Sequence, residues 1–299
     1  MNELITTLGQ SGDIAVYLLI DMAVAIVLLG GIRFTMGFIG NVDTKDELAI
    51  KDNFAYGISM AGAVAAMGIA LSGAITGELA GSYSIELFGM FTYGLAGLVL
   101  IKAGRFIHDK FALPAFNKHQ LILDRNISVA LVDAASVIAT AIVVRAALIW
   151  VEGLDVNTFI AIVAAWIVSQ VMLVLITRIF EWKFSHNNSV SFQDTLEGGH
   201  IALAIRYAGY LISTAMSVTA ASYFIHYDAT NLWLGIGQWA VISLILMACL
   251  TVLTTIAKFI VLWGINRRVE VEDQENIGIA TIELTTSFSI ALLLMALMA

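Results

Sequence analysis

Eight long apolar runs constrain the fold of this chain more than any other feature of its sequence. A helix needs about 20 apolar residues to cross the roughly 30 Å hydrocarbon core of a bilayer. The chain is 60% hydrophobic and 13% charged, whereas soluble proteins carry about 25% charged residues. This composition excludes a soluble globular domain, and we predict an all-α polytopic membrane protein with eight transmembrane helices. The runs occupy residues 14–38, 54–76, 87–107, 127–150, 156–180, 201–224, 232–262 and 277–298.

The basic residues predict the orientation of these spans. Lys and Arg gather around the loops that follow the first, third, fifth and seventh runs, whereas loops 77–86, 151–155 and 225–231 contain neither. Because cytoplasmic loops carry an excess of Lys and Arg, we expect both termini on the outer side of the membrane. The formal charge of −8 and the lack of a basic stripe indicate no nucleic-acid partner.

An internal repeat divides the chain into two units. Residues 53–62 (NFAYGISMAG) match residues 200–209 (HIALAIRYAG), and residues 126–133 (NISVALVD) match residues 276–283 (NIGIATIE). We therefore place one four-span unit at 1–152 and a second at 153–299. Each unit consists of two helical hairpins, and since every hairpin has two spans, the repeats are parallel and not inverted. This arrangement allows four like hairpins to surround a central axis.

Small residues recur every four positions in the second and sixth spans. Such residues let helix backbones approach closely in lipid, where no hydrophobic force brings helices together. We interpret them as helix-packing positions, with a permeation path lined by small residues as the alternative. The set is Gly62, Ala66, Ala70, Ala74, Gly209, Ser213, Ser217 and Ala221.

The repeated segments share a short motif, in which an acidic loop precedes a helix start of the form Asn-x-Ala-x-Ala-Ile-x-x-x-Gly. Residues Glu47–Gly62 fit it with Gly57 in place of the second alanine, and Glu197–Gly209 fit it with His200 in place of the asparagine. With these motifs the sequence resembles the domain of unknown function 350 family (YjfL-like), as two tandem units that cover nearly the whole chain. The resemblance implies a multi-pass protein of the bacterial inner membrane without an established activity, and it supplies no catalytic or ligand residue.

Five ionisable residues fall inside the predicted spans. Each costs about 2.5–3.5 kcal/mol at the centre of a bilayer, so we expect them to face the bundle interior and to find partners. Depth estimated from the helical rise places them in two layers. We predict an outer buried pair, Asp21 with Arg145. We also predict an inner polar layer, a candidate ion or proton site, composed of Asp133, Glu283, Arg206, Asn53, Asn126, His200 and Asn276.

Two interpretations of the inner layer remain open. Arg206 faces two carboxylates, Asp133 and Glu283, so one carboxylate would be left over with a raised pKa and would carry a proton or attract a cation. Alternatively, all the buried charges are structural ties between helices. The five histidines are scattered without the i, i+4 spacing of a metal site, and we expect no metal and no cofactor. The segment 105–123 around Pro114 mixes basic and apolar residues, and we expect it to lie along the membrane surface.

Two functions from different classes are consistent with these features. The first is a small-solute or ion transporter or channel with a polar site in the cytoplasmic half. The second is a non-transporting scaffold that recruits cytoplasmic envelope-stress partners, for instance through the acidic loop 269–275, or organises lipid. An enzyme is not expected, since the sequence has no HExxH, no paired serine and histidine, and no nucleotide-binding motif. Expected partners are the lipid bilayer, a second copy in a homo-oligomer, and a cytoplasmic protein.

Overall fold

Helices make up the fold throughout the described part of the chain. The computed structural model describes residues 2–75, 82–151 and 155–298, and it contains no strand there. Eight helices in these ranges are long and apolar enough to cross a membrane, which confirms the predicted fold class. They are α1 (Asn2–Gly40), α2 (Phe54–Ala74), α3 (Tyr83–Ile107), α5 (Ile127–Trp150), α6 (Val156–Asn188), α8 (Ile201–Thr219), α9 (Leu232–Val261) and α10 (Ile277–Met298).

Six shorter segments connect or extend these helices. They are η1 (Asp46–Ile50), η2 (His108–Ala112), α4 (Lys118–Leu123), α7 (Phe192–Glu197), η3 (Ala220–Phe224) and η4 (Val269–Asp273).

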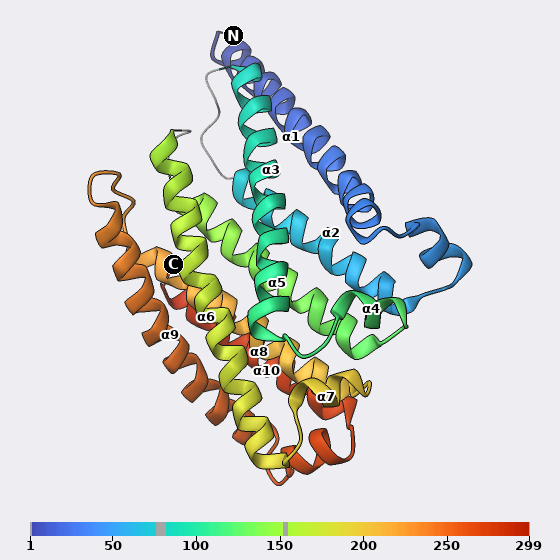
Figure 1. The fold of residues 1–299 in the computed structure, drawn as a ribbon. Coiled ribbons are helices and arrows are strands. Elements are labelled where there is room, and N and C mark those ends of the chain that lie inside the picture. The colour runs from blue at the N-terminus through green and yellow to red at the C-terminus, as the bar shows by residue number, and fades with distance from the viewer. Residues whose placement is uncertain (1, 76–81, 152–154, 299) are drawn as a thin grey trace.

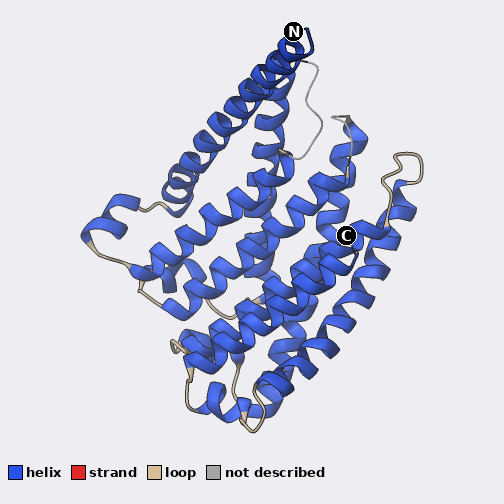
Figure 2. Ribbon diagram, turned by 180° about the vertical axis from the view of Figure 1, so that it is seen from behind, coloured by secondary structure: helices blue, strands red, loops and turns tan. Residues whose placement is uncertain are grey.

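The long helices form two crossing layers (Figure 1). The first helices of the four hairpins, α1, α3, α6 and α9, contact one another in that order and form one row. The second helices, α2, α5, α8 and α10, form another row in which each packs along the next. Figure 2, seen from behind, shows this second row with no further layer of helices over it.

The hairpins form an open row and do not surround a central axis. The burial of the second helices shows that the row is open, because a closed ring would bury a similar share of all four helices. In the most apolar stretches of α5 and α8, 78% and 72% of the residues are buried, against 50% in α2 and 28% in α10. The expectation of a central axis is therefore wrong. The repeat defines equivalent hairpins. Whether the hairpins form a ring or an open row depends on which helix faces pack together.

Glycines on the second helices set the closeness of this packing. A Cβ added to Gly62 of α2 would lie 2.5 Å from the Cβ of Ala134 on α5, and one added to Gly209 of α8 would lie 2.5 Å from the Cα of Leu284 on α10. The helix axes approach so closely because these positions lack a side chain. Of the small residues singled out in the sequence, Ala74 is half-buried and the others are buried.

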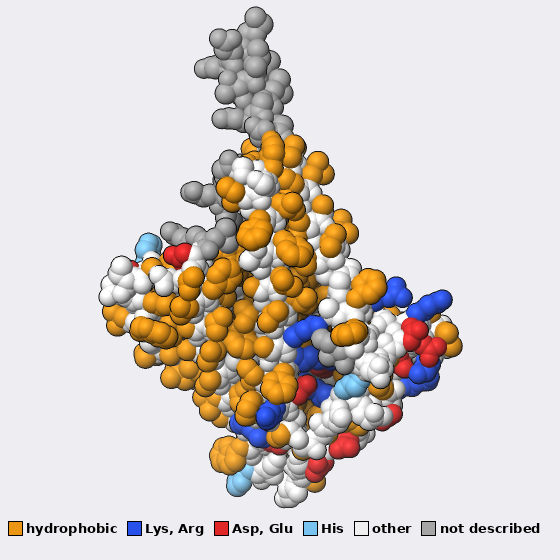
Figure 3. Space-filling model, turned by 45° about the horizontal axis from the view of Figure 1, so that its top comes forward, with side chains coloured by type: hydrophobic (Ala, Val, Ile, Leu, Met, Phe, Trp, Pro, Cys, Tyr) orange, Lys and Arg blue, Asp and Glu red, His pale blue; other side chains and the backbone are white. Residues whose placement is uncertain are grey.

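All four connections within the hairpins lie at one end of the molecule, which we call the basic end: residues 41–53, 108–126, 189–200 and 262–276. In Figure 3 most charged side chains of the visible face gather toward its lower part and its right, while hydrophobic side chains cover most of the remaining face. Part of the segment 105–123, which we expected to lie along the membrane surface, packs into the protein, while Phe106 and Phe111 are exposed. Leu113, Lys118 and Ile122 are buried, with 3% or less of each exposed, because Lys118 points into the protein and finds carboxylate partners there.

The second helix of each hairpin begins in the same way. A residue with positive φ precedes a polar side chain that caps the helix by accepting a hydrogen bond from the backbone N–H three residues on. The residues with positive φ that precede the caps are Asp52, Arg125, Gly199 and Glu275. The capping residues are Asn53, Asn126, His200 and Asn276.

Candidate functional site

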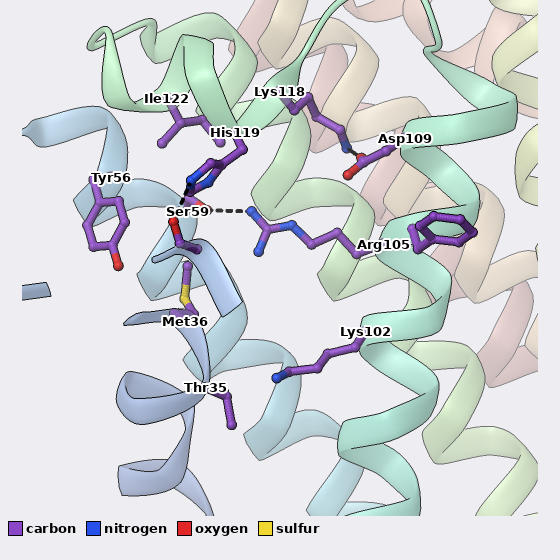
Figure 4. A pocket seen from close by; sticks show the side chains of 12 residues that line it. Thr35, Met36, Tyr56, Ser59, Lys102, Arg105, Asp109, Lys118, His119 and Ile122 are labelled. Carbon is purple, nitrogen blue, oxygen red and sulfur yellow. Dashed lines mark hydrogen bonds and ion pairs between the residues drawn. The ribbon is translucent and has the colours of Figure 1, made fainter. Parts of the chain in front are cut away.

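A pocket of about 400 Å³ opens at the basic end between α1, α2, α3 and α4. Its lining includes three cations, Lys102, Arg105 and Lys118, and one carboxylate, Asp109. Figure 4 shows Lys102 and Arg105 extending from α3 into the pocket and Lys118 reaching down from α4 to Asp109. We call this space the first pocket; it carries more positive than negative charge.

Asp133 of α5 is the buried anion behind the first pocket. Its side chain is fully buried, and Arg105 binds it in a bidentate manner, with Nε 2.9 Å from Oδ1 and Nη2 2.7 Å from Oδ2. The hydroxyl of Ser59 donates a further hydrogen bond to Oδ2 at 2.6 Å. Lys118 Nζ lies 3.7 Å from Oδ1. A buried carboxylate needs this degree of compensation, since an unpaired charge in such a place is very costly.

A chain of hydrogen bonds leads from the first pocket into the second unit. Lys118 donates to Nδ1 of His108 at 3.2 Å, so Nε2 of that ring carries the hydrogen and donates to the hydroxyl of Tyr207 at 2.8 Å. Tyr207 in turn lies 2.7 Å from the hydroxyl of Thr177. Every member is buried, and each polar atom of the chain has a partner. The two units are thus joined by polar contacts as well as by helix packing.

A second pocket of about 280 Å³ lies between α6, α8, α9, α10 and η4. Arg206 of α8 forms an ion pair with Glu283 of α10, donates to Glu272 at 2.6 Å, and donates to the backbone oxygen of Arg267 at 2.7 Å. Arg267 Nη1 lies 3.4 Å from Glu283. We call this space the second pocket. Its lining contains five cationic and two anionic side chains.

The two pockets are equivalent under the internal repeat. On α3 and η2, residues Lys102, Arg105, Phe106 and Asp109 line the first pocket, and on α9 residues 251, 254, 255 and 258 line the second, each 149 positions later. On α1, residues 35, 36 and 40 line the first pocket, and on α6 residues 179, 180 and 184 line the second, each 144 positions later. Each unit therefore contains one pocket with the same helical framework.

Both pockets contain an ion pair between an arginine and a buried carboxylate, but the arginine lies on a different helix in each unit. Glu283 takes the place of Asp133, at an offset of 150. In the first unit the guanidinium comes from Arg105 of α3, opposite Ser59 of α2. In the second unit α8 carries Arg206 at the Ser59 position, and α9 carries a threonine at the Arg105 position. The contact between carboxylate and guanidinium is thus common to both units, while the helix that supplies the guanidinium is not.

Each pocket also contains lysine side chains without a hydrogen-bond or ion-pair partner among the described residues: Lys102 in the first pocket, and the exposed Lys183 and the buried Lys258 in the second. Among the residues that the structure describes, neither Lys102 in the first pocket nor Lys258 in the second makes a hydrogen bond or an ion pair within 4.0 Å. Lys258 is only 8% exposed, and its buried ammonium faces the second pocket. An unpaired cation in a confined space attracts an anion.

The structure divides the predicted inner layer between two sites. Arg206 meets Glu283 as expected, but it does not meet Asp133, whose partners are Arg105 and Lys118. Equal depth along the helices did not predict which residues meet, because Arg206 contacts Glu283 on α10. The signal that was missed is the repeat itself: Lys118 and Arg267 stand 149 positions apart, and each approaches the acidic residue of its own unit.

The four capping residues of that layer tie loops together and do not line the pockets. Asn53 Nδ2 donates to the backbone oxygens of Ile122 and Leu123, and Asn126 Nδ2 to those of Leu196 and Glu197. His200 Nε2 lies 3.2 Å from the backbone oxygen of Glu272, and Asn276 Nδ2 lies 2.8 Å from a carboxylate oxygen of Glu270.

The predicted outer pair does not form. Arg145 Nε donates to the hydroxyl of Ser72 at 3.0 Å, and Asp21 lies beside Glu86 of α3. No ion pair joins Asp21 to Arg145 in the described part of the chain. The reason is topological, because α1 packs on α2 and α3 while Arg145 faces α2 from the side of α5. Asp21 and Arg145 were predicted to pair because of their equal depth, but the helices α1 and α5 do not pack side by side at these residues.

The loop before α2 contains a carboxylate whose titration is coupled to folding. Glu47 is buried, with Lys51 Nζ at 2.6 Å and Asn53 Nδ2 at 3.0 Å. Burial raises the pKa of Glu47, but the hydrogen bonds from Lys51 and Asn53 outweigh it and hold the pKa below its ordinary value of 4.5. Stability from this carboxylate is therefore complete above pH 4.5 and is lost as the pH falls through the lower folded pKa.

We expect Glu47→Gln to lower the melting temperature of the purified protein at neutral pH and to have little effect in acid, where the wild-type carboxyl group is itself protonated. Thermal unfolding followed by tryptophan fluorescence across this pH range tests it. Glu197→Gln, which neutralises an exposed carboxylate at the same end of the molecule, serves as the control and should show no such pH dependence. An equal loss at every pH would contradict the assignment.

Comparison with known proteins identifies a family but no activity. A family model described as Domain of Unknown Function (DUF350) matches residues 4–148 and, a second time, residues 153–298. No curated protein and no solved structure matches the chain. Groups of three or more histidine, cysteine, aspartate or glutamate residues suited to a metal ion are not found among the described residues.

Proposed function

This chain belongs to the DUF350 family, with two units in tandem, and from that premise we propose that it is a membrane transporter or channel for a small anionic solute. The two pockets at the basic end are its solute sites. In this proposal the basic end faces the cytoplasm of a bacterial cell and both termini lie on the outer side, as the distribution of Lys and Arg favours.

The charge of the pockets supports an anion over a cation. Arg206 and Arg267 neutralise Glu283, and Arg206 also neutralises Glu272. No carboxylate of the second pocket is left to attract a metal ion or proton, which disfavours the left-over carboxylate anticipated from the sequence. The surplus charge of the pocket is positive. A low-dielectric pocket between helices makes such a surplus more attractive to anions than it would be in water.

The single observation that carries the proposal is Lys258. Its ammonium group is nine-tenths buried and has no partner in the described part of the chain, although burying a lone charge is costly. The ion pairs of the pocket join neighbouring helices and therefore have a structural role. The side chain of Lys258 joins no helices, because it makes no hydrogen bond or ion pair among the described residues. A bound anion would supply the missing partner.

We expect Lys258→Gln to reduce anion flux by about tenfold to a hundredfold, since a charge-assisted hydrogen bond is worth about 1.5–3 kcal/mol. Stability should be unchanged or increased, because the variant removes an unpaired buried charge. Uptake of radiolabelled phosphate and of chloride into proteoliposomes, measured together with the melting temperature, tests both statements. Lys258→Arg keeps the charge and should retain most of the flux.

Lys45→Gln is the matched control, because Lys45 is exposed and lies outside both pockets. Wild-type flux in the Lys258→Gln protein would remove the second pocket from the path. An equal loss of flux in the Lys45→Gln protein would reduce the effect to net charge and would also overturn the proposal. An absence of phosphate and chloride flux in the wild-type protein would leave binding without transport, as in the second function below.

A second function, the organisation of anionic lipid, is favoured by the first pocket. Apolar side chains contribute to its lining, and Phe106 at its edge is 60% exposed, so an acyl chain would lie against it while the headgroup meets Lys102 and Arg105. Basic pockets between transmembrane helices bind lipid headgroups in this manner. Native mass spectrometry with phosphatidylglycerol against phosphatidylcholine separates the two functions. Retained phosphatidylglycerol, released by Lys102→Gln and unaffected by free phosphate, would indicate lipid.

A further inference from the structure

The second helices follow one packing rule along the row. The ninth residue after each cap packs on the eighth residue after the next cap: Gly62 of α2 on Ala134 of α5, and Gly209 of α8 on Leu284 of α10. At the junction of the two units, the corresponding residues are Ala135 of α5 and Ala208 of α8. Both are buried, at 3% and 6% exposed. The steps within the two units thus follow one rule, and the corresponding residues at the junction between the units are buried as well.

The rule is left incomplete only at the two ends of the row. At the last helix, the ninth residue after the cap is Thr285, and it is exposed. At the first helix, the eighth residue after the cap is Ala61, which is also exposed. The equivalents of both positions are covered everywhere else in the row. At α10 the exposed face is the one with which the other second helices contact the next helix in the row. At α2 the exposed face is the one with which the other second helices contact the preceding helix.

Small side chains extend along both of these exposed faces. On α2 the exposed face continues through Ala65 and Gly68, and a Cβ added to Gly68 would meet nothing within 4 Å. On α10 it continues through Thr281 and Ser289, four residues to either side of Thr285. Small residues in contact with lipid gain nothing there, but they allow close approach of another helix.

The capping residues show the same missing step at the basic end. A cap donates to the backbone oxygen four residues before the next cap, as Asn53 does to Ile122, Asn126 to Leu196, and His200 to Glu272. The side-chain amide of Asn276, the last cap, donates to Glu270 of its own loop, and within the described residues it donates to no backbone oxygen of another hairpin.

The corresponding acceptors in the first loop are free of any such cap. They are the backbone oxygens of Ala49 and Ile50, four and three residues before Asn53. Both residues are exposed, whereas Ile122 and Leu196, which occupy the position of Ala49 in the next two loops, are 2% and 0% exposed. The first loop lacks the neighbour that covers the equivalent loops.

We propose that a second copy of this chain continues the row, with α10 of one copy packed on α2 of the next. Thr285 of the first copy then meets Ala61 of the second, and Asn276 donates to the backbone oxygens of Ala49 and Ile50. The contact is heterologous, because two different faces meet, so the copies form either a closed ring or an extended row in the plane of the membrane. The occupant of each face is identified by continuity with the interface that already joins the two units.

Cysteine cross-linking distinguishes this contact from all symmetric ones. In a Cys249→Ala background, which removes the exposed native thiol, Ala61→Cys and Thr285→Cys are made in separate chains and the two proteins are co-expressed. Oxidation by copper phenanthroline, which takes up the two electrons, should join them, because a disulfide requires Cβ atoms about 4 Å apart. We expect about tenfold more dimer from the mixture than from either variant alone, since only the mixture holds the two thiols at contact distance.

The double variant in one chain extends the test. It should yield a ladder of cross-linked species, because every copy then offers both ends. Val252→Cys mixed with Ile26→Cys, two exposed positions on the other layer of helices, measures random collision and should give little dimer.

Two results would overturn the proposal. Equal cross-linking by Ala61→Cys alone or by Thr285→Cys alone would indicate a symmetric contact, and no dimer above the collision control would show that lipid covers the ends. Thr285→Trp provides an independent measurement by native mass spectrometry from nanodiscs. It should convert the oligomer to single chains while leaving the melting temperature of each chain unchanged. An oligomer that persists in this variant would also contradict the contact.

Discussion

Arg105→Thr is expected to destabilise the protein by about 3–5 kcal/mol, because it leaves Asp133 buried without its guanidinium. Adding Ser59→Arg to this variant should restore most of the loss. The double variant reproduces in the first unit the arrangement of the second, where α8 supplies the arginine and α9 a threonine. Melting temperatures of the three purified proteins, with Ser59→Arg as the third, test the exchange.

The single variants make this experiment decisive. Ser59→Arg alone crowds a second guanidinium against Arg105 and removes the hydroxyl that donates to Asp133, so it should be less stable than the wild type. The double variant should then be more stable than either single variant, an interaction between neighbouring sites that independent changes cannot produce. A double variant whose loss equals the sum of the two single losses would show that the two units are not interchangeable at this position.

Gly62→Ala should destabilise the packing of α2 on α5 by up to about 3 kcal/mol. The added methyl group would lie 2.5 Å from the Cβ of Ala134 and 2.6 Å from its Cα. Because part of the collision is with the main chain of α5, no side-chain rotation relieves it, and the helices must move apart. Gly209→Ala should have a similar effect, since its Cβ would lie 2.5 Å from the Cα of Leu284.

Gly237→Ala on α9 is the control for these variants. A Cβ at that position meets nothing within 4 Å, and substitutions of this kind usually change stability by no more than about 0.5 kcal/mol. Unfolding in mild detergent, followed by tryptophan fluorescence, gives the comparison. Similar melting temperatures for all three alanine variants would mean that the close approach at Gly62 and Gly209 does not limit stability.

The spans were predictable from the sequence because one physical requirement determines them. A helix in lipid must be apolar along its length, so the runs at 127–150 and 232–262 agree with α5 and α9 to within a residue. The parallel repeats were predictable for the same reason, since a repeated pattern of small and apolar residues implies a repeated environment. Depth within the membrane was estimated from the helical rise, and it grouped the buried ionisable residues into two layers.

The partners of the buried charges required information that depth does not contain. Asp133 and Arg206 lie on neighbouring helices, yet they belong to different pockets because Arg206 faces away from α5. Arg105 and Lys118 were assigned to a loop or to the membrane surface, although the repeat places Lys118 in register with Arg267. Equivalent positions in the two units were therefore a better guide to contacts than equal depth was.

The open row also determines how the parts of this molecule influence one another. Substantial helix contacts in the described ranges join hairpins that are consecutive in the chain: α1 and α2 meet α3 and α5, these meet α6 and α8, and these meet α9 and α10. As in stacked-repeat proteins, stability then resembles a sum of local terms and nearest-neighbour terms. Any cooperativity between the first pocket and the second must pass through the junction of α3, η2 and α5 with α6 and α8, which includes the hydrogen bonds that join His108 to Tyr207 and Tyr207 to Thr177. The strength of that junction therefore limits how strongly the two halves can communicate.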